Sequence, residues 1–454
     1  MAEFLQNSDA FVWSIEGDPR LRSTIVTLVL LDRTPDWCEV VNRFDQLSRR
    51  VRTFRQRVVS SPLPTMPPSW EVDPDFDLSY HLRRVTAPAP GTVDTVLEMA
   101  RIAAMADFDR SRPLWEVTMV DGLSDGGAAL LCKLHHAITD GVGAVELGKI
   151  LYDRAAPFEK CAISAAPTAA APSSLGRLRD GLRYEFGLVA GAGWGVWKAA
   201  QATAASAIRQ PFATTKDAYS TAASVYRTTR PITRPGSPIM VGRSRGRRLA
   251  MHDVPMEALH RAGVVAGGTL NDAFLAAVAG GLRRYHHAHG VEVGDLTVTM
   301  PISIRTAADP LGGNRATLMR FAVPAAVDDA AQRIRMIHEL TDEVRHEESL
   351  AHTQLIAGAL NLAPRWYVSS VLRNVDFVAS DVPGIPTPVF LAGAAVRSQH
   401  AFSPTIGAAF NITLLSYVDT CSIGINADTG AIPDFDVFLD CITAGFDDVL
   451  ALAD

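Results

Sequence analysis

The sequence contains few cysteines, and their pattern argues against two kinds of site. There are five in 454 residues, at positions 38, 132, 161, 421 and 441. Their number is odd, no two form a CxxC pair, and the spacings between them are long. Thiols of this kind are typical of a reduced cytosolic protein, so we expect neither a disulfide framework nor a zinc site.

Long hydrophobic runs and export signals are also missing. No stretch reaches the ~18 uninterrupted apolar residues that a membrane-spanning helix needs. The first residues, MAEFLQNSDAFVW, show no basic region followed by an apolar one, so we see no secretory signal peptide. We therefore expect a cytoplasmic location for this chain.

Nucleotide motifs and a strong positive charge are absent as well. The sequence has no Walker A loop and no GxGxxG, which leaves nucleotide hydrolysis and dinucleotide chemistry unsupported. The net charge of −6 argues against nucleic acid as a partner. A composition of 48% hydrophobic and 20% charged residues is that of a globular protein, not of a disordered or coiled-coil chain. At roughly 150 residues per domain, the length predicts two or three domains.

Two parts of the chain mix strand and helix patterns, which predicts a mixed α/β (α+β) protein with two related halves. In residues 1–160, the run 23–31 is rich in β-branched residues and 128–134 has the apolar character of a buried strand. In residues 251–454, a helix is expected over 271–289. Further expected elements are a helix over 40–51 and strands over 296–300, 410–417 and 422–426.

The segment that joins the halves, residues 161–250, has a different composition. It begins with an Ala/Pro/Ser-rich stretch typical of a loose linker. It holds 13 Lys and Arg against 3 Asp and Glu, so its net charge is +10 and the rest of the chain carries −16. Large apolar residues alternate with basic ones over 177–198. This pattern indicates either an amphipathic element that lies on an anionic membrane or a bridging helix with a solvated face.

The motif with the clearest chemistry is HHAITDG, residues 135–141. It follows a predicted strand that ends at Leu134 and precedes a helical pattern over 142–151, so two histidines end a strand and Asp140 begins a helix. An imidazole titrates near neutral pH and can take a proton from a hydroxyl and return it to a leaving group. A second HxxxD, from His338 to Asp342, lies in a charged helical pattern without such a context.

Two other interpretations of the motif remain open. Asp140 can be only a helix N-cap that accepts hydrogen bonds from the next turn, with both histidines packed in the core. A metal site built from His135, His136 and Asp140 is disfavoured, because adjacent strand residues point to opposite faces. We therefore predict acid–base chemistry and no metal.

At these residues the chain resembles the bacterial wax ester synthase/diacylglycerol acyltransferase family, and in particular the actinobacterial triacylglycerol synthases. The resemblance covers about residues 5 to 450 and is most specific at HHxxxDG and the preceding PLWE. One departure is Asp381, where the family usually has Asn. The matching segments are Ser8–Phe11, Arg112–Glu116, His135–Gly141, Asn271–Asp272, Pro301–Arg305 and Gly313–Asn314.

The resemblance implies two halves like those of chloramphenicol acetyltransferase, with mixed sheets and an active-site channel between them. It also implies acyl-CoA as co-substrate, no further cofactor, and diacylglycerol or a fatty alcohol as acceptor. Carried over to this chain, His136 is the general base, Asp140 is its structural companion, and Gly141 closes the motif. His135 matches the first histidine, whose role the resemblance leaves less defined.

Two further residues are predicted to serve the site from the second half. Asn271 is the candidate donor to the oxyanion, since such stabilisation is usually the largest catalytic term. Alternatively, Thr269 to Asp272 form only a capping box that opens the next helix. Arg305 is the candidate partner of Asp140, or else an ordinary surface arginine.

Rival functions use other features of the sequence. Gly242 to Gly246 match GxSxG, but the alternating pattern that follows is that of a strand, which disfavours a serine esterase. The histidines at 286, 287 and 289 end a predicted helix, where a structural role is expected.

Wax ester synthesis, esterification of another lipid alcohol, and an inactive lipid-binding protein are the alternatives to triacylglycerol synthesis. Because such substrates dissolve in membranes, we expect peripheral attachment to the inner membrane face or to lipid bodies.

Overall fold

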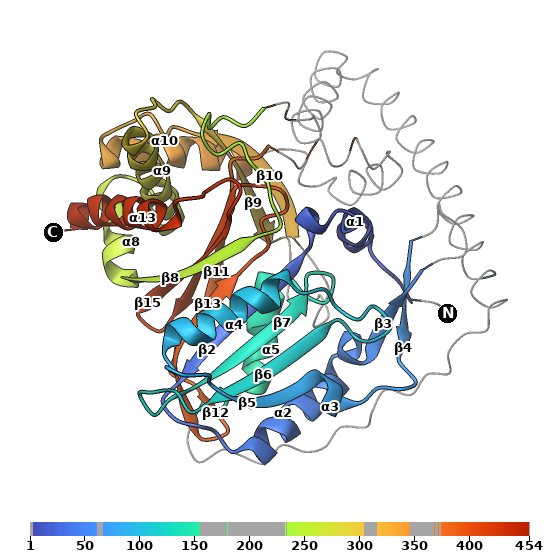
Figure 1. The fold of residues 1–454 in the computed structure, drawn as a ribbon. Helices are drawn as coiled ribbons and strands as arrows, with labels where there is room; N and C mark the ends of the chain where they lie inside the picture. Colours follow the sequence, from blue (N-terminus) through green and yellow to red (C-terminus); the bar gives the residue numbers. More distant parts are fainter. Residues whose placement is uncertain are drawn as a thin grey trace, which may run out of the picture.

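The computed structural model describes residues 3–60, 67–154, 234–303, 316–345 and 374–453, together with Arg179, Ile232, Tyr367 and Val371. Two lobes lie side by side in Figure 1, one coloured blue to cyan and the other green to red. Their strands form two six-stranded sheets, and a small three-stranded sheet lies beside the first lobe. The expected fold class, a mixed α/β protein with two halves, is confirmed.

The first sheet has the strand order β12-β13-β2-β7-β6-β5. Its strands are β2 (Thr24–Leu31), β5 (Leu82–Thr86), β6 (Trp115–Asp121), β7 (Ala128–His135), β12 (Phe390–Leu391) and β13 (Ala394–Phe402). Helices α2 (Trp37–Arg50) and α5 (Gly141–Leu151) pack on one face, and α4 (Val93–Met105) packs on the other. Because both faces of β2 are covered, its sequence is apolar throughout instead of alternating.

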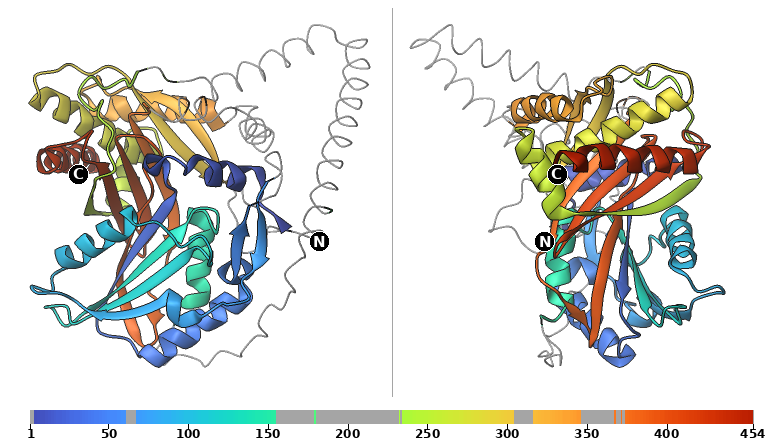
Figure 2. Two further views of the ribbon diagram at one scale, coloured as in Figure 1. Left: turned by 45° about the vertical axis from the view of Figure 1, so that its right-hand side comes forward. Right: turned by 90° about the vertical axis from the view of Figure 1, so that its left-hand side faces the viewer.

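The second sheet has the strand order β10-β9-β11-β14-β15-β8. Its strands are β8 (Arg247–Pro255), β9 (Leu296–Ser303), β10 (Ala316–Val323), β11 (Phe377–Ile385), β14 (Phe410–Tyr417) and β15 (Thr420–Asp428). The helices packed on it are α8 (Met256–Val265), α9 (Leu270–Ala288), α10 (Ala330–Arg345) and α13 (Phe435–Leu450). Both views of Figure 2 place α10 at the opposite end of the molecule from α2.

The first sheet contains two strands from the second half of the chain, which the predicted boundary at residue 250 does not anticipate. Strands β12 and β13 come from the expected second half, yet they complete the first sheet, where β13 pairs antiparallel with β2. Figure 1 shows β13 running into the first lobe. The pairing with β13 covers an edge of β2 that would otherwise be open to pairing with another chain. Strand β8 also begins at Arg247, inside the expected linker, as the alternating pattern there indicated.

The remaining elements are short or peripheral. The small sheet has the order β1-β4-β3, and helices α1 and α3 accompany the first lobe. No single helix in the described part of the chain is long and apolar enough to span a membrane, and α8 and α9, which meet these criteria only as a pair, are bent by 92°. The bounds are β1 (Glu3–Phe4), β3 (Gln56–Val59), β4 (Ser69–Val72), α1 (Asn7–Ile15), α3 (Leu78–His81) and the 3-10 turns Pro19–Leu21, Arg52–Arg55 and Ala451–Ala453.

Candidate active site

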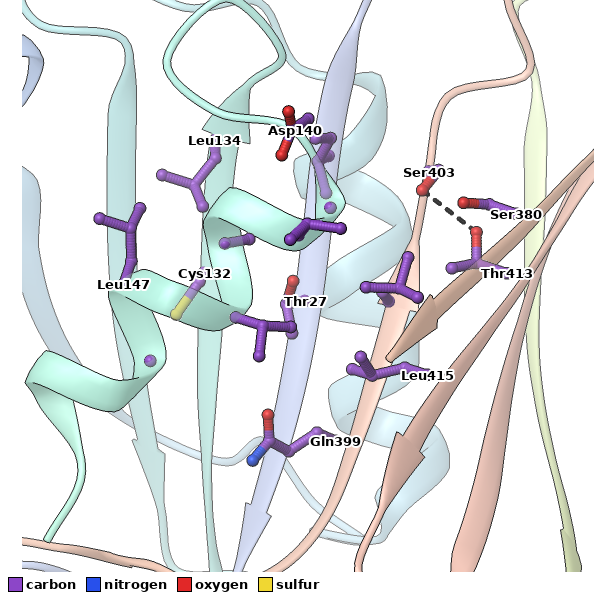
Figure 3. Close-up of a pocket in the computed structure, with 18 of the residues that line it drawn as sticks. Thr27, Cys132, Leu134, Asp140, Leu147, Ser380, Gln399, Ser403, Thr413 and Leu415 are labelled. Carbon is purple, nitrogen blue, oxygen red and sulfur yellow. Dashed lines mark hydrogen bonds between the residues drawn. The ribbon is translucent and has the colours of Figure 1, made fainter. Parts of the chain in front are cut away.

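An apolar cavity of about 180 Å³ lies between the two lobes, and both contribute to its wall. The first lobe supplies side chains of β2, β7, α2 and α5, and the second supplies side chains of β9, β10, β11 and β14. In the close-up of Figure 3, Leu134, Cys132 and Leu147 line one side, while Ser380, Thr413 and Leu415 line the other. The expected position of the channel, between the two halves, agrees with this geometry.

His136 lies where β7 ends and lines this cavity. Its backbone N–H donates to the carbonyl of Ser23, 2.9 Å away, which holds it beside the start of β2. The ring Nδ1 is buried and meets no hydrogen-bond partner in another described residue. This leaves Nε2 as the ring nitrogen that can meet a substrate.

Burial lowers the pKa of His136, because the charged imidazolium is poorly solvated there. The Asp140 carboxylate and the backbone carbonyl of His136 itself oppose this effect. A lowered pKa favours the neutral imidazole, in which one ring nitrogen carries a free lone pair. A neutral imidazole in this form has the properties of a general base at neutral pH.

Asp140 is the N-cap of α5, and its side chain accepts a hydrogen bond of 2.7 Å from the backbone N–H of Gly143. The predicted N-cap is therefore present. The same residue lines the cavity and raises the pKa of His136 through its charge. Asp140 thus contributes to the electrostatics of the site as well as to helix capping (Figure 3).

Gly141 is the first residue of α5 and lies close to β11 of the second sheet. A Cβ atom at this position would lie 2.8 Å from Cγ2 of Val382 on β11. Any larger residue would push α5 away from the second sheet. The glycine of the motif is therefore required by packing.

His135 points away from the cavity and into a polar cluster of the first lobe. The N–H of Ala137 donates to its Nδ1 at 3.1 Å, so Nε2 carries the proton and donates to Oε1 of Glu16 at 2.9 Å. Oε1 of Glu16 also accepts from the N–H of Ser23, and Oε2 accepts from Arg110. The structure does not bring His135 to the substrate cavity, and its contacts are those of a positioning residue.

Asn271 and Arg305 are not placed at the cavity by the structure. Asn271 is the second residue of α9 and is not among the residues that line the cavity. The capping box of Thr269 and Asp272 is present, which confirms the alternative interpretation of that segment. An oxyanion role for Asn271 stays a prediction. Arg305 lies outside the described residues.

The GxSxG match and the histidine at 286, which the sequence analysis set aside, have structural roles. The Ser244 hydroxyl donates to Asp428 at 2.7 Å, and strand β8 follows it where an esterase needs a helix. The buried ring of His286 bonds Ser237 and the carbonyl of Leu282. Among the described residues, no group of three or more His, Cys, Asp or Glu side chains is arranged to hold a metal ion.

The sequence analysis missed two sets of site residues. Glu16, which holds His135, is 119 positions away from it and belongs to no recognisable motif. A polar group on the far wall includes a 3.1 Å hydrogen bond from Thr413 to Ser403, with Ser380 beside them, and Gln399 lines the cavity at some distance from this group (Figure 3). These residues come from three different strands, so no local spacing connects them.

Comparison with protein-family models matches nearly the whole chain. Residues 5–274 match the model described as wax ester synthase/diacylglycerol acyltransferase catalytic domain. Residues 312–449 match the model described as WS/DGAT C-terminal domain. One similar protein, from Mycobacterium tuberculosis and named as a candidate diacylglycerol O-acyltransferase, is 36% identical over 443 residues, covering 96% of this chain and 90% of its own.

Solved structures with a similar fold include a wax ester synthase/diacylglycerol acyltransferase and a condensation domain. The wax ester synthase/diacylglycerol acyltransferase from Marinobacter aquaeolei VT8 has a TM-score of 0.65 at 21% identity, with 99% of both chains covered. The starter condensation domain of rhizomide synthetase, in a complex with C8-CoA, has a TM-score of 0.61 at 13% identity, with 98% and 95% covered. At these identities the likeness concerns the fold alone.

Proposed function

The chain belongs to the wax ester synthase/diacylglycerol acyltransferase family, and on that basis we propose that it makes triacylglycerol from acyl-CoA and 1,2-diacylglycerol. The observation that carries the proposal is His136, a base in an apolar cavity that both lobes enclose. Acyl-CoA is a co-substrate in this reaction, and no resident cofactor takes part.

The proposed reaction is a direct transfer. Nε2 of His136 takes the proton of the acceptor hydroxyl as its oxygen attacks the thioester carbonyl. The resulting tetrahedral species collapses, the carbon–sulfur bond breaks, and the departing CoA sulfur receives the proton from the imidazolium. The products are the new ester and CoA, and the enzyme returns to its initial state without an acyl-enzyme.

The surroundings of His136 support both states of the base. Burial keeps the ring neutral before the reaction, and the nearby Asp140 carboxylate stabilises the imidazolium once it forms. The apolar wall excludes water, which would otherwise compete with the acceptor and hydrolyse the thioester. Such a site suits an acyl chain and a lipid alcohol.

Replacement of His136 by alanine tests the mechanism. With labelled palmitoyl-CoA and diacylglycerol, we expect kcat to fall 10²-fold or more, since a positioned general base contributes about this much. His338→Ala, in the second HxxxD, is the matched control and should keep near wild-type turnover. Retention of more than about a tenth of the activity by His136→Ala contradicts the general-base role.

The acceptor is the part of the proposal with a close rival. Wax ester synthesis uses the same base and the same thioester but a fatty alcohol as acceptor. Competition between hexadecanol and diacylglycerol at equal surface concentration separates the two activities by their products. An inactive lipid-binding protein is the third possibility, and it predicts no product with either acceptor.

We also propose that the protein attaches peripherally to a membrane or lipid-body surface from the cytoplasmic side, because both lipid substrates reside there. The basic stretch 177–248, most of which lies outside the described residues, is the proposed contact. Binding to phosphatidylglycerol vesicles should weaken as salt rises, because salt screens surface charge. Equal sedimentation at low and high salt contradicts an electrostatic attachment.

A further inference from the structure

A second cavity, of about 260 Å³, lies beside the first and differs from it in charge. Its wall contains three arginines, Arg22, Arg245 and Arg247, and no carboxylate among the described residues that line it. The arginines come from the turn before β2 and from the start of β8, so both lobes contribute. The other lining residues are Pro19, Thr24, Ala104, Met105, Pro404, Thr405 and Asn426.

The two cavities are neighbours that share one lining residue. Pro404 lines both of them. Thr24, in the wall of the basic cavity, is the register partner of His135 in the β2–β7 pair. His136 itself bonds the backbone of Ser23, the residue before Thr24. The basic cavity therefore adjoins the apolar cavity at Pro404, close to the start of β2 that also holds the backbone of His136.

Two buried polar atoms in the wall of the basic cavity have no hydrogen-bond partner in the described part of the chain. They are Oγ1 of Thr405, a residue 2% exposed, and Oδ1 of Asn426, a residue 3% exposed. The amide nitrogen of Asn426 donates to the carbonyl of Ser403, which fixes its oxygen as the free acceptor. Unpartnered polar atoms at such depth are rare in proteins and are expected to meet a ligand or water.

The three arginines are not equivalent. Arg22 bonds Asp107 and the carbonyl of Met105, and Arg247 forms an ion pair of 3.1 Å with Asp428. These contacts hold both guanidinium groups in place. Arg245 is exposed and forms no ion pair with any residue that the structure describes. It is therefore the cation that an incoming anion can engage without displacing a carboxylate.

We propose that the basic cavity binds the phosphate-bearing nucleotide portion of acyl-CoA, with Arg245 as a phosphate ligand. This inference rests on the proposed function, which requires an acyl-CoA donor. Guanidinium groups and the Thr405 hydroxyl donate to phosphate oxygens, and the oxygen of Asn426 accepts from an amide N–H or a hydroxyl of the same ligand. The thioester then enters the apolar cavity and the charged portion stays outside it.

Steady-state kinetics of the purified full chain test the assignment with Arg245→Gln. We expect the KM for palmitoyl-CoA to rise roughly tenfold, the effect of one charge-assisted hydrogen bond, with kcat and the KM for diacylglycerol unchanged. Palmitoyl-pantetheine has the same thioester but lacks the nucleotide, and its KM should not change. Arg248→Gln is the matched control, since Arg248 lies three residues further along, on β8, and pairs with Asp436 outside the cavity.

Calorimetric binding of CoA itself separates this proposal from the proposed function. Wild type should bind CoA more tightly than Arg245→Gln, and as tightly as Arg248→Gln. If neither donor is turned over but CoA binding still depends on Arg245, the transferase proposal fails and the binding site stands. Equal CoA affinity in all three proteins, or an equal rise of KM for both thioesters in Arg245→Gln, overturns the assignment of this cavity.

Discussion

Removal of the Glu16 carboxylate should weaken both the fold and the catalytic site. This carboxylate is 4% exposed and accepts from the Ser23 N–H at 2.7 Å, from Nε2 of His135 at 2.9 Å and from Arg110 at 2.8 Å. Ser23 in turn accepts the backbone N–H of His136 through its carbonyl. Glu16 thus connects Arg110 with the two residues that hold His136 in place. These are Ser23, which accepts the His136 N–H, and His135, which precedes His136 in the chain.

The size of the effect follows from the groups that Glu16→Ala leaves without a partner. The Ser23 N–H and the His135 Nε2–H are buried, and a buried unsatisfied donor costs about 1–3 kcal/mol. Arg110 is 42% exposed and can bond water instead, so its loss adds little. We expect the free energy of unfolding to fall by about 2–6 kcal/mol, the sum for the two donors. Glu16→Gln keeps an acceptor oxygen for these donors and should lose less than half as much.

Urea unfolding and turnover measure the two consequences separately. Under conditions where Glu16→Ala is folded, its kcat should fall while its KM for acyl-CoA stays near that of wild type, since Glu16 touches neither cavity. Glu16→Gln should recover most of the kcat. If Glu16→Ala unfolds within 0.5 kcal/mol of wild type by this measurement, the energetic reasoning is refuted, since such a change is typical of an ordinary surface substitution.

The same carboxylate predicts a pH effect on stability. Burial alone would raise the pKa of Glu16, but the hydrogen bonds that its carboxylate accepts from His135 and the Ser23 N–H, together with the nearby Arg110 guanidinium, outweigh burial and lower the pKa below the ordinary value of 4.5. A lowered carboxyl pKa contributes stability that is present above pH 4.5 and is lost as the pH falls through the lowered value. Glu16→Gln should remove this part of the acid-side dependence, and an unchanged curve contradicts it.

Three further changes test the site. Because burial lowers the pKa of His136 below the ordinary value of 6.5, kcat/KM should still be high at pH 6.5 and should decline only at lower pH, where the imidazole becomes protonated. A decline in kcat/KM with a midpoint above pH 6.5 contradicts the expected neutral base. Gly141→Ala should cost about 1–3 kcal/mol of unfolding free energy through its contact with Val382, and adding Val382→Ala should restore at least half of it. Gln399→Met should raise the unfolding free energy by about 1–3 kcal/mol, because Nε2 of Gln399 is buried without a partner in the described residues; a loss of stability refutes this.

Local patterns in the sequence predicted much of the secondary structure. The expected strand over 23–31 is β2 (Thr24–Leu31), and the expected helix over 271–289 is α9 (Leu270–Ala288). The helix expected over 40–51 begins earlier, at Trp37, because the Asp36 side chain caps it. Periodicity and capping act between residues only a few positions apart, so the sequence contains enough information for them.

No local sequence pattern indicated that β12 and β13 would join the first sheet. The residues of β13 have the composition of an ordinary strand, and nothing in them distinguishes pairing with β2 from pairing within the second sheet. Which edge a strand joins depends on the edges left open after the rest of the chain has folded. The predicted boundary at residue 250 was therefore based on composition, whereas the sheets are defined by which strands pair.

What the sequence determined by itself is the local geometry of the motif: a strand that turns His135 and His136 to opposite faces and an aspartate that caps the following helix. Tertiary structure alone decided which of the two histidines meets the cavity and which meets Glu16. Burial and partner choice depend on groups more than a hundred positions away, and those groups come together only when the two sheets pack against each other.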